Sequence, residues 1–157
     1  PCPWLEAGAL ARLDIGSSIG TLNLSNVNLT IASSAELLLE FSDTGLDQIL
    51  ITGGSASLLG SNKFSLAAGS AVPGPYKWGL GIYDFVVGSN VTWTPVYDNM
   101  TNLLSSYGLV EGLHYSFGVA DLGNYQALRL EFIPEPSTVL LLVGGGLLLW
   151  RVRRRQG

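Results

Sequence analysis

The C-terminal end of the chain carries an apolar segment that is unsuited to the surface of a soluble domain. In this 157-residue sequence no charge occurs between Ser137 and Trp150, and Arg151 follows at once. Because the segment has no polar face, it cannot lie on a globular body with one side in water. Its three central glycines would each cost about 1 kcal/mol in a soluble helix, but glycine is frequent in membrane helices. The segment therefore predicts a transmembrane helix.

The predicted span is short and ends in a cluster of positive charge. It comprises Ser137, Thr138, Val139, Leu140, Leu141, Leu142, Val143, Gly144, Gly145, Gly146, Leu147, Leu148, Leu149 and Trp150. A helix of this length rises roughly 21 Å, against a hydrocarbon core of about 30 Å. The cluster comprises Arg151, Arg153, Arg154 and Arg155. Positive charge of this kind stays on the cytoplasmic side, so we expect everything before the span to face outward.

A Pro-Glu-Pro triplet, Pro134, Glu135 and Pro136, comes directly before the span. Proline cannot continue a helix interior, so we expect a stiff extended joint at the membrane surface. The order of triplet, Ser-Thr pair, short apolar helix and arginine cluster resembles the PEP-CTERM sorting signal of Gram-negative bacteria. The resemblance implies that an exosortase, a membrane-embedded cysteine transpeptidase-like enzyme, recognises the triplet and cuts near it. The alternative is an ordinary single-span anchor that is never processed.

The charges of the chain divide sharply along its length. All 12 acidic residues lie at or before Glu135, whereas four of the eight basic residues form the C-terminal cluster. With four bases against twelve acids, the body carries a net charge of −8. An acidic body with scattered bases has no basic patch, which argues against a nucleic-acid partner. The single cysteine, Cys2, allows no intrachain disulfide.

The body reads as a series of short β-strands. Between residues 11 and 67, apolar bursts are separated by Gly, Ser, Asn and Asp, and Val27, Leu29 and Ile31 alternate with polar neighbours. Period-two alternation is typical of strands, and a spacing of about eight to eleven residues is typical of all-β folds. The apolar pattern of residues 27–38 recurs about 21 or 22 positions later in residues 49–59, a period in the solenoid range.

The phrases GTLNLSNVNLTI, DQILITGGSASLLGSNKFSLAA and GIYDFVV resemble the C-terminal part of autotransporter-associated β-strand repeat proteins, over Leu13 to Phe132. The resemblance implies a parallel β-helix. We therefore expect an all-β, parallel β-helix or solenoid-like body, with a β-sandwich as the alternative, followed by one short C-terminal transmembrane helix.

We expect three regions. Residues 1–12 would be the poorly ordered N-terminal piece of a longer precursor, residues 13–132 a β-rich extracellular domain, and residues 133–157 the sorting signal.

The last part of the body departs from the repeating pattern. Residues 97–107 place apolar side chains at helical spacing, and Gly108 is expected to end that helix. Residues 114–120 and 126–132 read as two strands joined by a turn at Gly123.

Four carboxylates, Glu36, Glu40, Asp43 and Asp47, form the densest acidic group of the chain. Such a group could line a polysaccharide-cleaving groove or hold calcium. Its other interpretation is a solvated loop edge. His114 is the only histidine, and no Gly-x-Ser-x-Gly elbow occurs. We therefore predict no catalytic site, no metal site and no cofactor.

Aromatic side chains suggest a second kind of site. Tyr76, Trp78 and Trp93, together with Tyr83, could stack on sugar rings. The alternative is that these aromatics fill a β-core or close the end of a stack.

The sequence thus predicts a surface or extracellular-matrix protein with a structural or adhesive role. It would be sorted by an exosortase after a transient stay in the inner membrane, with exopolysaccharide as a candidate partner. The alternative is a secreted β-helix protein that binds or degrades polysaccharide.

Overall fold

The computed structural model describes residues 4–7, 11–15, 19–42, 45–67 and 81–133. Strands make up 59% of these residues and the single helix among them is short, so the all-β prediction is confirmed. None of the helices in the described ranges has the length and hydropathy needed to cross a bilayer. The predicted transmembrane helix and arginine cluster lie outside the described residues.

The elements follow one another at short intervals along the chain. In order they are β1 (Trp4–Ala7), β2 (Arg12–Asp14), β3 (Thr21–Ser25), β4 (Asn28–Ile31), β5 (Glu36–Phe41), β6 (Gln48–Thr52), β7 (Ser55–Leu58), β8 (Ser61–Leu66), β9 (Ile82–Gly88), β10 (Asn90–Trp93), β11 (Tyr97–Asp98), α1 (Met100–Ser105), β12 (Tyr115–Asp121) and β13 (Gln126–Phe132).

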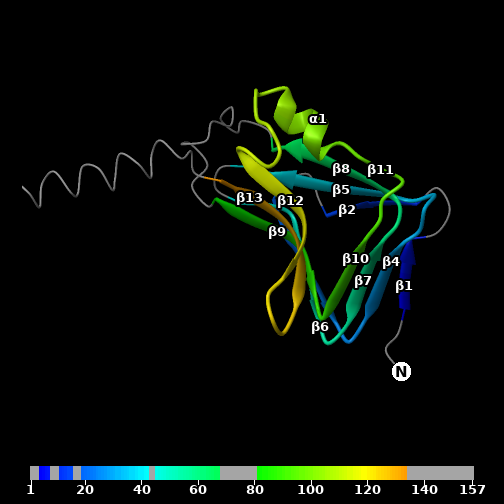
Figure 1. Ribbon diagram of the computed structural model, residues 1–157. Coiled ribbons are helices and arrows are strands. Elements are labelled where there is room, and N and C mark those ends of the chain that lie inside the picture. The colour runs from blue at the N-terminus through cyan, green and yellow to red at the C-terminus, as the bar shows by residue number, and fades with distance from the viewer. Residues whose placement is uncertain (1–3, 8–10, 16–18, 43–44, 68–80, 134–157) are drawn as a thin grey trace, which may run out of the picture.

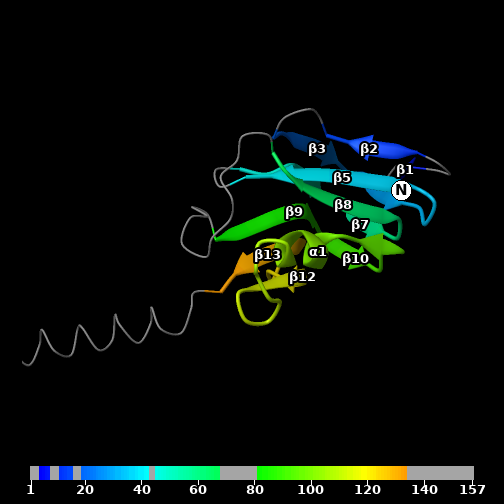
Figure 2. The same ribbon diagram turned by 90° about the horizontal axis from the view of Figure 1, so that it is seen from above.

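The strands form three sheets in a regular sequence. From β1 to β8, each strand pairs in parallel with the third strand after it. The resulting orders are β1-β4-β7-β10, β11-β8-β5-β2 and β12-β13-β9-β6-β3. Figure 1 shows the three sheets as three walls around a shared interior, and Figure 2 shows their strands layered from β1–β3 toward the β12–β13 hairpin.

The register of the sheets differs from the repeat predicted from the sequence. That repeat aligned Leu29 with Ile51, whereas the structure pairs Leu29 with Ala56 and Ile51 with Leu24. Asn28 and Ser55, which hydrogen-bond between adjacent strands, are 27 positions apart. The predicted period was wrong because an alternating apolar pattern matches itself at any even shift. The corners between strands, which are polar and unequal in length, decide the true spacing.

The interior is filled by the inward-facing half of each strand. The burial of β5 alternates strictly, with Leu37, Leu39 and Phe41 buried and the residues between them partly exposed. Phe41, Phe64 and Phe85, one from each of β5, β8 and β9, meet edge to face at ring-centroid distances of 5.5 and 5.0 Å. Edge-to-face pairs of this kind add about 0.5–1.5 kcal/mol each to the burial of their area.

The corner between β6 and β7 lies directly on the corner between β3 and β4. Asn26 and Gly53 both have positive φ, at 54° and 73°. A Cβ placed on the neighbouring Gly54 would lie 1.8 Å from the carbonyl oxygen of Val27. Asn28 Oδ1 accepts hydrogen bonds from the backbone N–H of Ser55 (3.1 Å) and from its hydroxyl (2.9 Å). Close stacking at this corner therefore depends on the absence of a side chain at Gly54.

The predicted helix and hairpin after β10 are both confirmed. Helix α1 buries Met100 and Leu104, and Gly108 follows it at a φ of 78°. Strands β12 and β13 pair antiparallel, and β13 pairs antiparallel with β9. Phe117 of β12 contacts Phe64 at 5.2 Å and Trp93 at 4.9 Å. The hairpin thus covers the aromatic interior at the β10 side of the stack.

The N-terminal segment also contributes to the sheets. Trp4–Ala7 forms β1 and pairs in parallel with β4, although the sequence predicted a poorly ordered piece over residues 1–12. The boundary predicted after residue 12 falls within β2. The parallel pairing of β1 with β4 and of β2 with β5 continues the pattern of the body into this segment.

Candidate functional site

The outer face of the five-stranded sheet carries a β-bulge that arranges its polar side chains. Arg129 pairs with Asp84 and Leu128 pairs with Val86, so Phe85 has no partner of its own on β13. As a result Phe85 and Val86 are both buried in succession, while Asp84 stays on the outer face. Bulges of this kind redirect side chains and are frequent beside functional sites.

The redirected Asp84 forms a bidentate ion pair with Arg129. Arg129 Nε donates to Oδ1 at 2.7 Å and Nη2 donates to Oδ2 at 3.0 Å. The two side chains are 19% and 23% exposed, compared with 49% and 28% for the Lys63–Glu36 pair, so the Asp84–Arg129 pair is less screened by solvent. The hydrogen bonds from the guanidinium to Asp84 raise the pKa of Arg129 above its ordinary value. The site therefore holds a fixed and internally neutralised pair of charges.

An open groove of about 420 Å³ lies beside this ion pair. One wall comes from β6, where Gln48 donates through Nε2 to the backbone oxygen of Asp84 at 2.9 Å. The hairpin turn between β12 and β13 contributes Tyr125. The lining residues are Gln48, Leu50, Ile51, Thr52, Gly53, Asp84, Val87, Gly88, Ser89, Asn124 and Tyr125. In volume the groove falls within the roughly 300–1,000 Å³ range of ligand sites.

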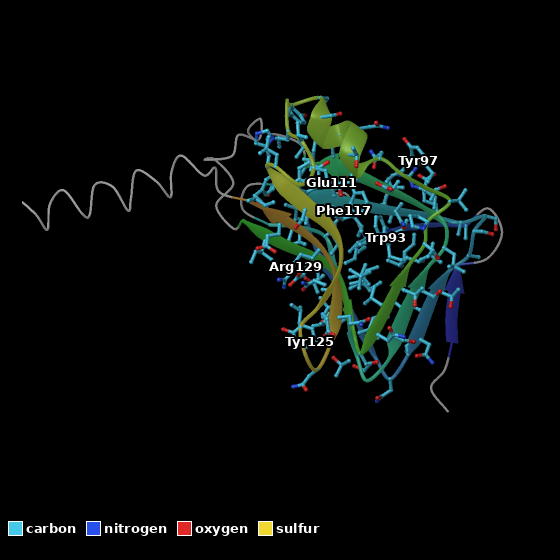
Figure 3. All side chains as sticks on the ribbon, viewed as in Figure 1. Trp93, Tyr97, Glu111, Phe117, Tyr125 and Arg129 are labelled. Carbon is cyan, nitrogen blue, oxygen red and sulfur yellow. The ribbon has the colours of Figure 1, made fainter. Side chains whose placement is uncertain are left out.

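A second hollow of about 200 Å³ lies on the other side of the ion pair, over β12 and β13, and Arg129 and Glu131 are among its lining residues. Figure 3 shows Arg129 on the outer side of the hairpin and Tyr125 near its turn, while Trp93 and Phe117 lie together in the interior. The outer face of this sheet thus carries two hollows separated by one neutralised ion pair.

Of the four carboxylates predicted as a group, Glu36 and Asp47 have separate roles. Glu36 pairs with Lys63 at 2.9 Å. Asp47 is fully buried, and its two oxygens accept from the backbone N–H groups of Gly20 (2.9 Å) and Glu40 (2.8 Å). Asp43 lies outside the described residues. Over the parts of the chain that the structure describes, no three His, Cys, Asp or Glu side chains gather in a way that could hold a metal ion.

Asp47 stabilises the corner between β5 and β6 through its two backbone hydrogen bonds. Replacing it should therefore lower the stability of the fold. We expect Asp47→Asn to lower the free energy of unfolding by about 1–3 kcal/mol, because a carboxamide turns an N–H₂ group toward one of the two donors. Asp47→Ala should cost about 2–5 kcal/mol, since both backbone N–H groups lose their acceptor. Urea unfolding followed by circular dichroism measures the difference.

Glu40→Gln is the matched control for Asp47, because it removes an equal charge nearby while the Glu40 backbone N–H still donates to Asp47. It should shift the free energy of unfolding by less than about 0.5 kcal/mol. Equal effects of Asp47→Asn and Glu40→Gln would contradict the assigned role.

The aromatic side chains predicted as sugar contacts are distributed differently from expectation. Tyr83 is fully buried, which agrees with the alternative interpretation, a place in the β-core. Trp93 is partly buried and packs against Phe117. Tyr76 and Trp78 lie outside the described residues. His114 accepts the backbone N–H of Val110 at its Nδ1, 2.9 Å away, and thereby holds a turn.

The groove residues were not singled out in the sequence. Gln48, Asp84 and Tyr125 come from β6, β9 and the β12–β13 turn, and only the pairing of these strands brings them together. In the sequence, Phe85 and Val86 are consecutive apolar residues that break the alternation of β9. This break is compatible with a bulge, but only the pairing with β13 places the bulge at Phe85.

Comparison with known families identifies the C-terminal segment. Residues 132–155 match the PEP-CTERM protein-sorting motif, which confirms the sorting signal predicted from the triplet, the apolar run and the arginines. The motif implies an exosortase as the processing partner and a membrane-anchored, exported protein of the cell envelope. No curated protein matches the chain in sequence.

Proposed function

We propose that this chain is a surface or matrix protein of a Gram-negative bacterium, released by exosortase cleavage and serving a structural or adhesive role. The proposal rests on the position at which the hydrogen-bonded body ends and the sorting signal begins. Strand β13 ends at Phe132, and the N–H of Ile133 still donates to the His114 oxygen at 2.8 Å. The triplet begins at the next residue, Pro134. A cut near it would leave the hydrogen bonds of the described body intact.

The charges support a transient hold in the inner membrane with the body outside. The arginine cluster favours a cytoplasmic position for the chain end. The rest of the chain carries a net charge of −8, so an anionic membrane surface would repel it once the tail is removed. Cleavage would therefore convert an anchored chain into one that moves freely into the matrix.

We further infer that the body is a short parallel β-helix. The pairing of every strand from β1 to β8 with the third strand after it supports this winding. The resemblance to autotransporter-associated β-strand repeats points the same way. In such a body each turn of chain stacks on the last, so an elongated scaffold could be built by adding turns.

We propose that the body acts without catalysis. His114, the one histidine of the chain, is occupied by a backbone donor at Nδ1. The fully buried Asp47 of the predicted acidic group is occupied by two backbone donors. These contacts give both residues a structural use. The alternative role, polysaccharide binding, is favoured by the groove beside Asp84.

Expression in two hosts tests the sorting proposal. The chain is placed behind a secretion signal and produced in a strain with exosortase and in an isogenic strain without it. We expect a loss of mass corresponding to the tail, and release from the membrane, only where exosortase is present. A variant with Pro134, Glu135 and Pro136 replaced by alanine should stay full length in both strains. If the mass and location of the original chain were the same in both strains, exosortase-dependent sorting would be contradicted.

A further inference from the structure

We propose that the groove between β6, β9 and the β12–β13 turn binds a segment of an uncharged polysaccharide. This deepens the adhesive role proposed above and rests on it only for location, because export places the groove where extracellular glycans occur. The chemistry of the groove's lining, its charge and its extent along the sheet all favour such a ligand.

The lining combines hydrogen-bonding side chains with one exposed aromatic ring. Gln48 and Asn124 supply carboxamides, and Thr52 supplies a hydroxyl. Ser89 donates its hydroxyl to the Gly54 oxygen at 2.6 Å, so it offers a ligand an acceptor. Carboxamides and hydroxyls both donate and accept, which suits the hydroxyls of a sugar. Tyr125 is 46% exposed at the edge of the groove. An aromatic ring with a free face offers an apolar surface against which the C–H face of a sugar ring can pack.

The charge of the groove selects against acidic and basic ligands. Asp84 is the single ionisable carboxylate among the groove's lining residues, and Arg129 holds both of its oxygens. A cationic ligand would have to compete with this bidentate pair. An anionic polymer would meet a body of net charge −8. A neutral chain meets neither penalty, because it needs only the hydrogen bonds and the aromatic face.

The extent of the site favours a polymer over a single sugar. The groove opens on the outer face of the sheet, and the second hollow continues on that face beyond the Asp84–Arg129 pair. Asp84 lines the first and Arg129 lines the second, so a ligand that spans both would cross the fixed ion pair. Because the bulge and the ion pair hold this surface in place before binding, little ordering is required when the ligand arrives.

The test uses the full chain, kept soluble in a detergent that has no sugar headgroup. Isothermal titration is carried out with four neutral hexasaccharides, built of β-1,4-glucose, β-1,3-glucose, β-1,4-mannose and β-1,4-xylose, and with acidic hexagalacturonate. We expect binding of at least one neutral oligomer and weaker or no binding of hexagalacturonate. Tyr125→Ala should weaken the neutral interaction about tenfold, the loss expected for one aromatic contact.

Tyr97→Ala is the matched control, because Tyr97 is 47% exposed on β11, in a different sheet. It should bind like the unmodified chain. Asn124→Ala, at the exposed hairpin turn, gives a second variant should Tyr125→Ala alter the circular dichroism spectrum, and it should also weaken binding. The inference is overturned if no neutral oligomer binds, if hexagalacturonate binds more tightly at a site that Tyr125→Ala weakens, or if Tyr97→Ala and Tyr125→Ala lose affinity equally. Since exosortase takes no part in the titration, its outcome is separate from that of the sorting test.

Discussion

Gly54→Ala should lower the free energy of unfolding by about 3 kcal/mol or more, the upper end of the range for overpacking a buried position. The added Cβ would lie 1.8 Å from the carbonyl oxygen of Val27 and 2.7 Å from its carbonyl carbon. Both are backbone atoms of the corner beneath, so relief requires the two corners to move apart. The lower chain entropy of alanine in the unfolded state stabilises by only about 0.4–1 kcal/mol. The steric term therefore dominates.

Gly88→Ala is the matched control for Gly54. Gly88 ends β9 at the next corner of the stack and is also buried, but its added Cβ would lie 3.3 Å from the nearest backbone oxygen, that of Gly54. We expect it to cost less than about 1 kcal/mol. Urea unfolding of both variants, followed by far-ultraviolet circular dichroism, measures the contrast. Similar midpoints for the two would show that the corners do not stack as the structure has them.

The strands of the body could be predicted because each carries its own signal. In β13, Leu128 and Leu130 face inward while Arg129 and Glu131 face outward, as the alternation required. The hairpin and helix α1 were equally local, since Gly123 and Gly108 mark their turns. Local spacing is sufficient for elements of this kind because side-chain direction repeats every two residues in a strand and every 3.6 in a helix.

The pairing of the strands could not be read in the same way. Leu29 would be equally buried beside Ile51 or beside Ala56, so burial does not decide between these two registers. The register is decided by the corner at Gly53 and Gly54, which must lie on Asn26 and Val27. The bulge at Phe85 depends on the partner strand β13, some 40 residues later in the chain. Register and bulges are properties of two strands together, so neither strand alone specifies them.

The same physical reason explains why the sorting signal could be predicted from the sequence and the groove could not. The sorting signal is contiguous, and its order of triplet, apolar run and arginines was sufficient to predict the motif found at residues 132–155. The groove draws Gln48, Asp84 and Tyr125 from distant segments that meet only after folding. A linear signal read by a membrane enzyme can be recognised from sequence, whereas a surface assembled from three strands requires the register.

Replacing Arg151, Arg153, Arg154 and Arg155 together by glutamine should reduce exosortase processing at least tenfold. The predicted helix rises only roughly 21 Å, whereas the hydrocarbon core of the bilayer is about 30 Å thick. Burial of its apolar side chains alone therefore anchors the chain weakly. Drawing one arginine into the bilayer centre costs about 2.5–3.5 kcal/mol, and four in succession form a barrier that stops the chain. Without that barrier we expect full-length protein that fractionates away from the inner membrane.

Replacing the same four arginines by lysine is the matched control, because lysine keeps the positive charge on which orientation depends. The lysine chain should be anchored and cut like the original, as measured by intact mass and membrane fractionation in the exosortase-containing host. If the glutamine chain were anchored and cut normally, the proposed electrostatic stop would be wrong. If both chains escaped processing, the enzyme would be reading the planar guanidinium groups themselves, and charge alone would not explain the cluster.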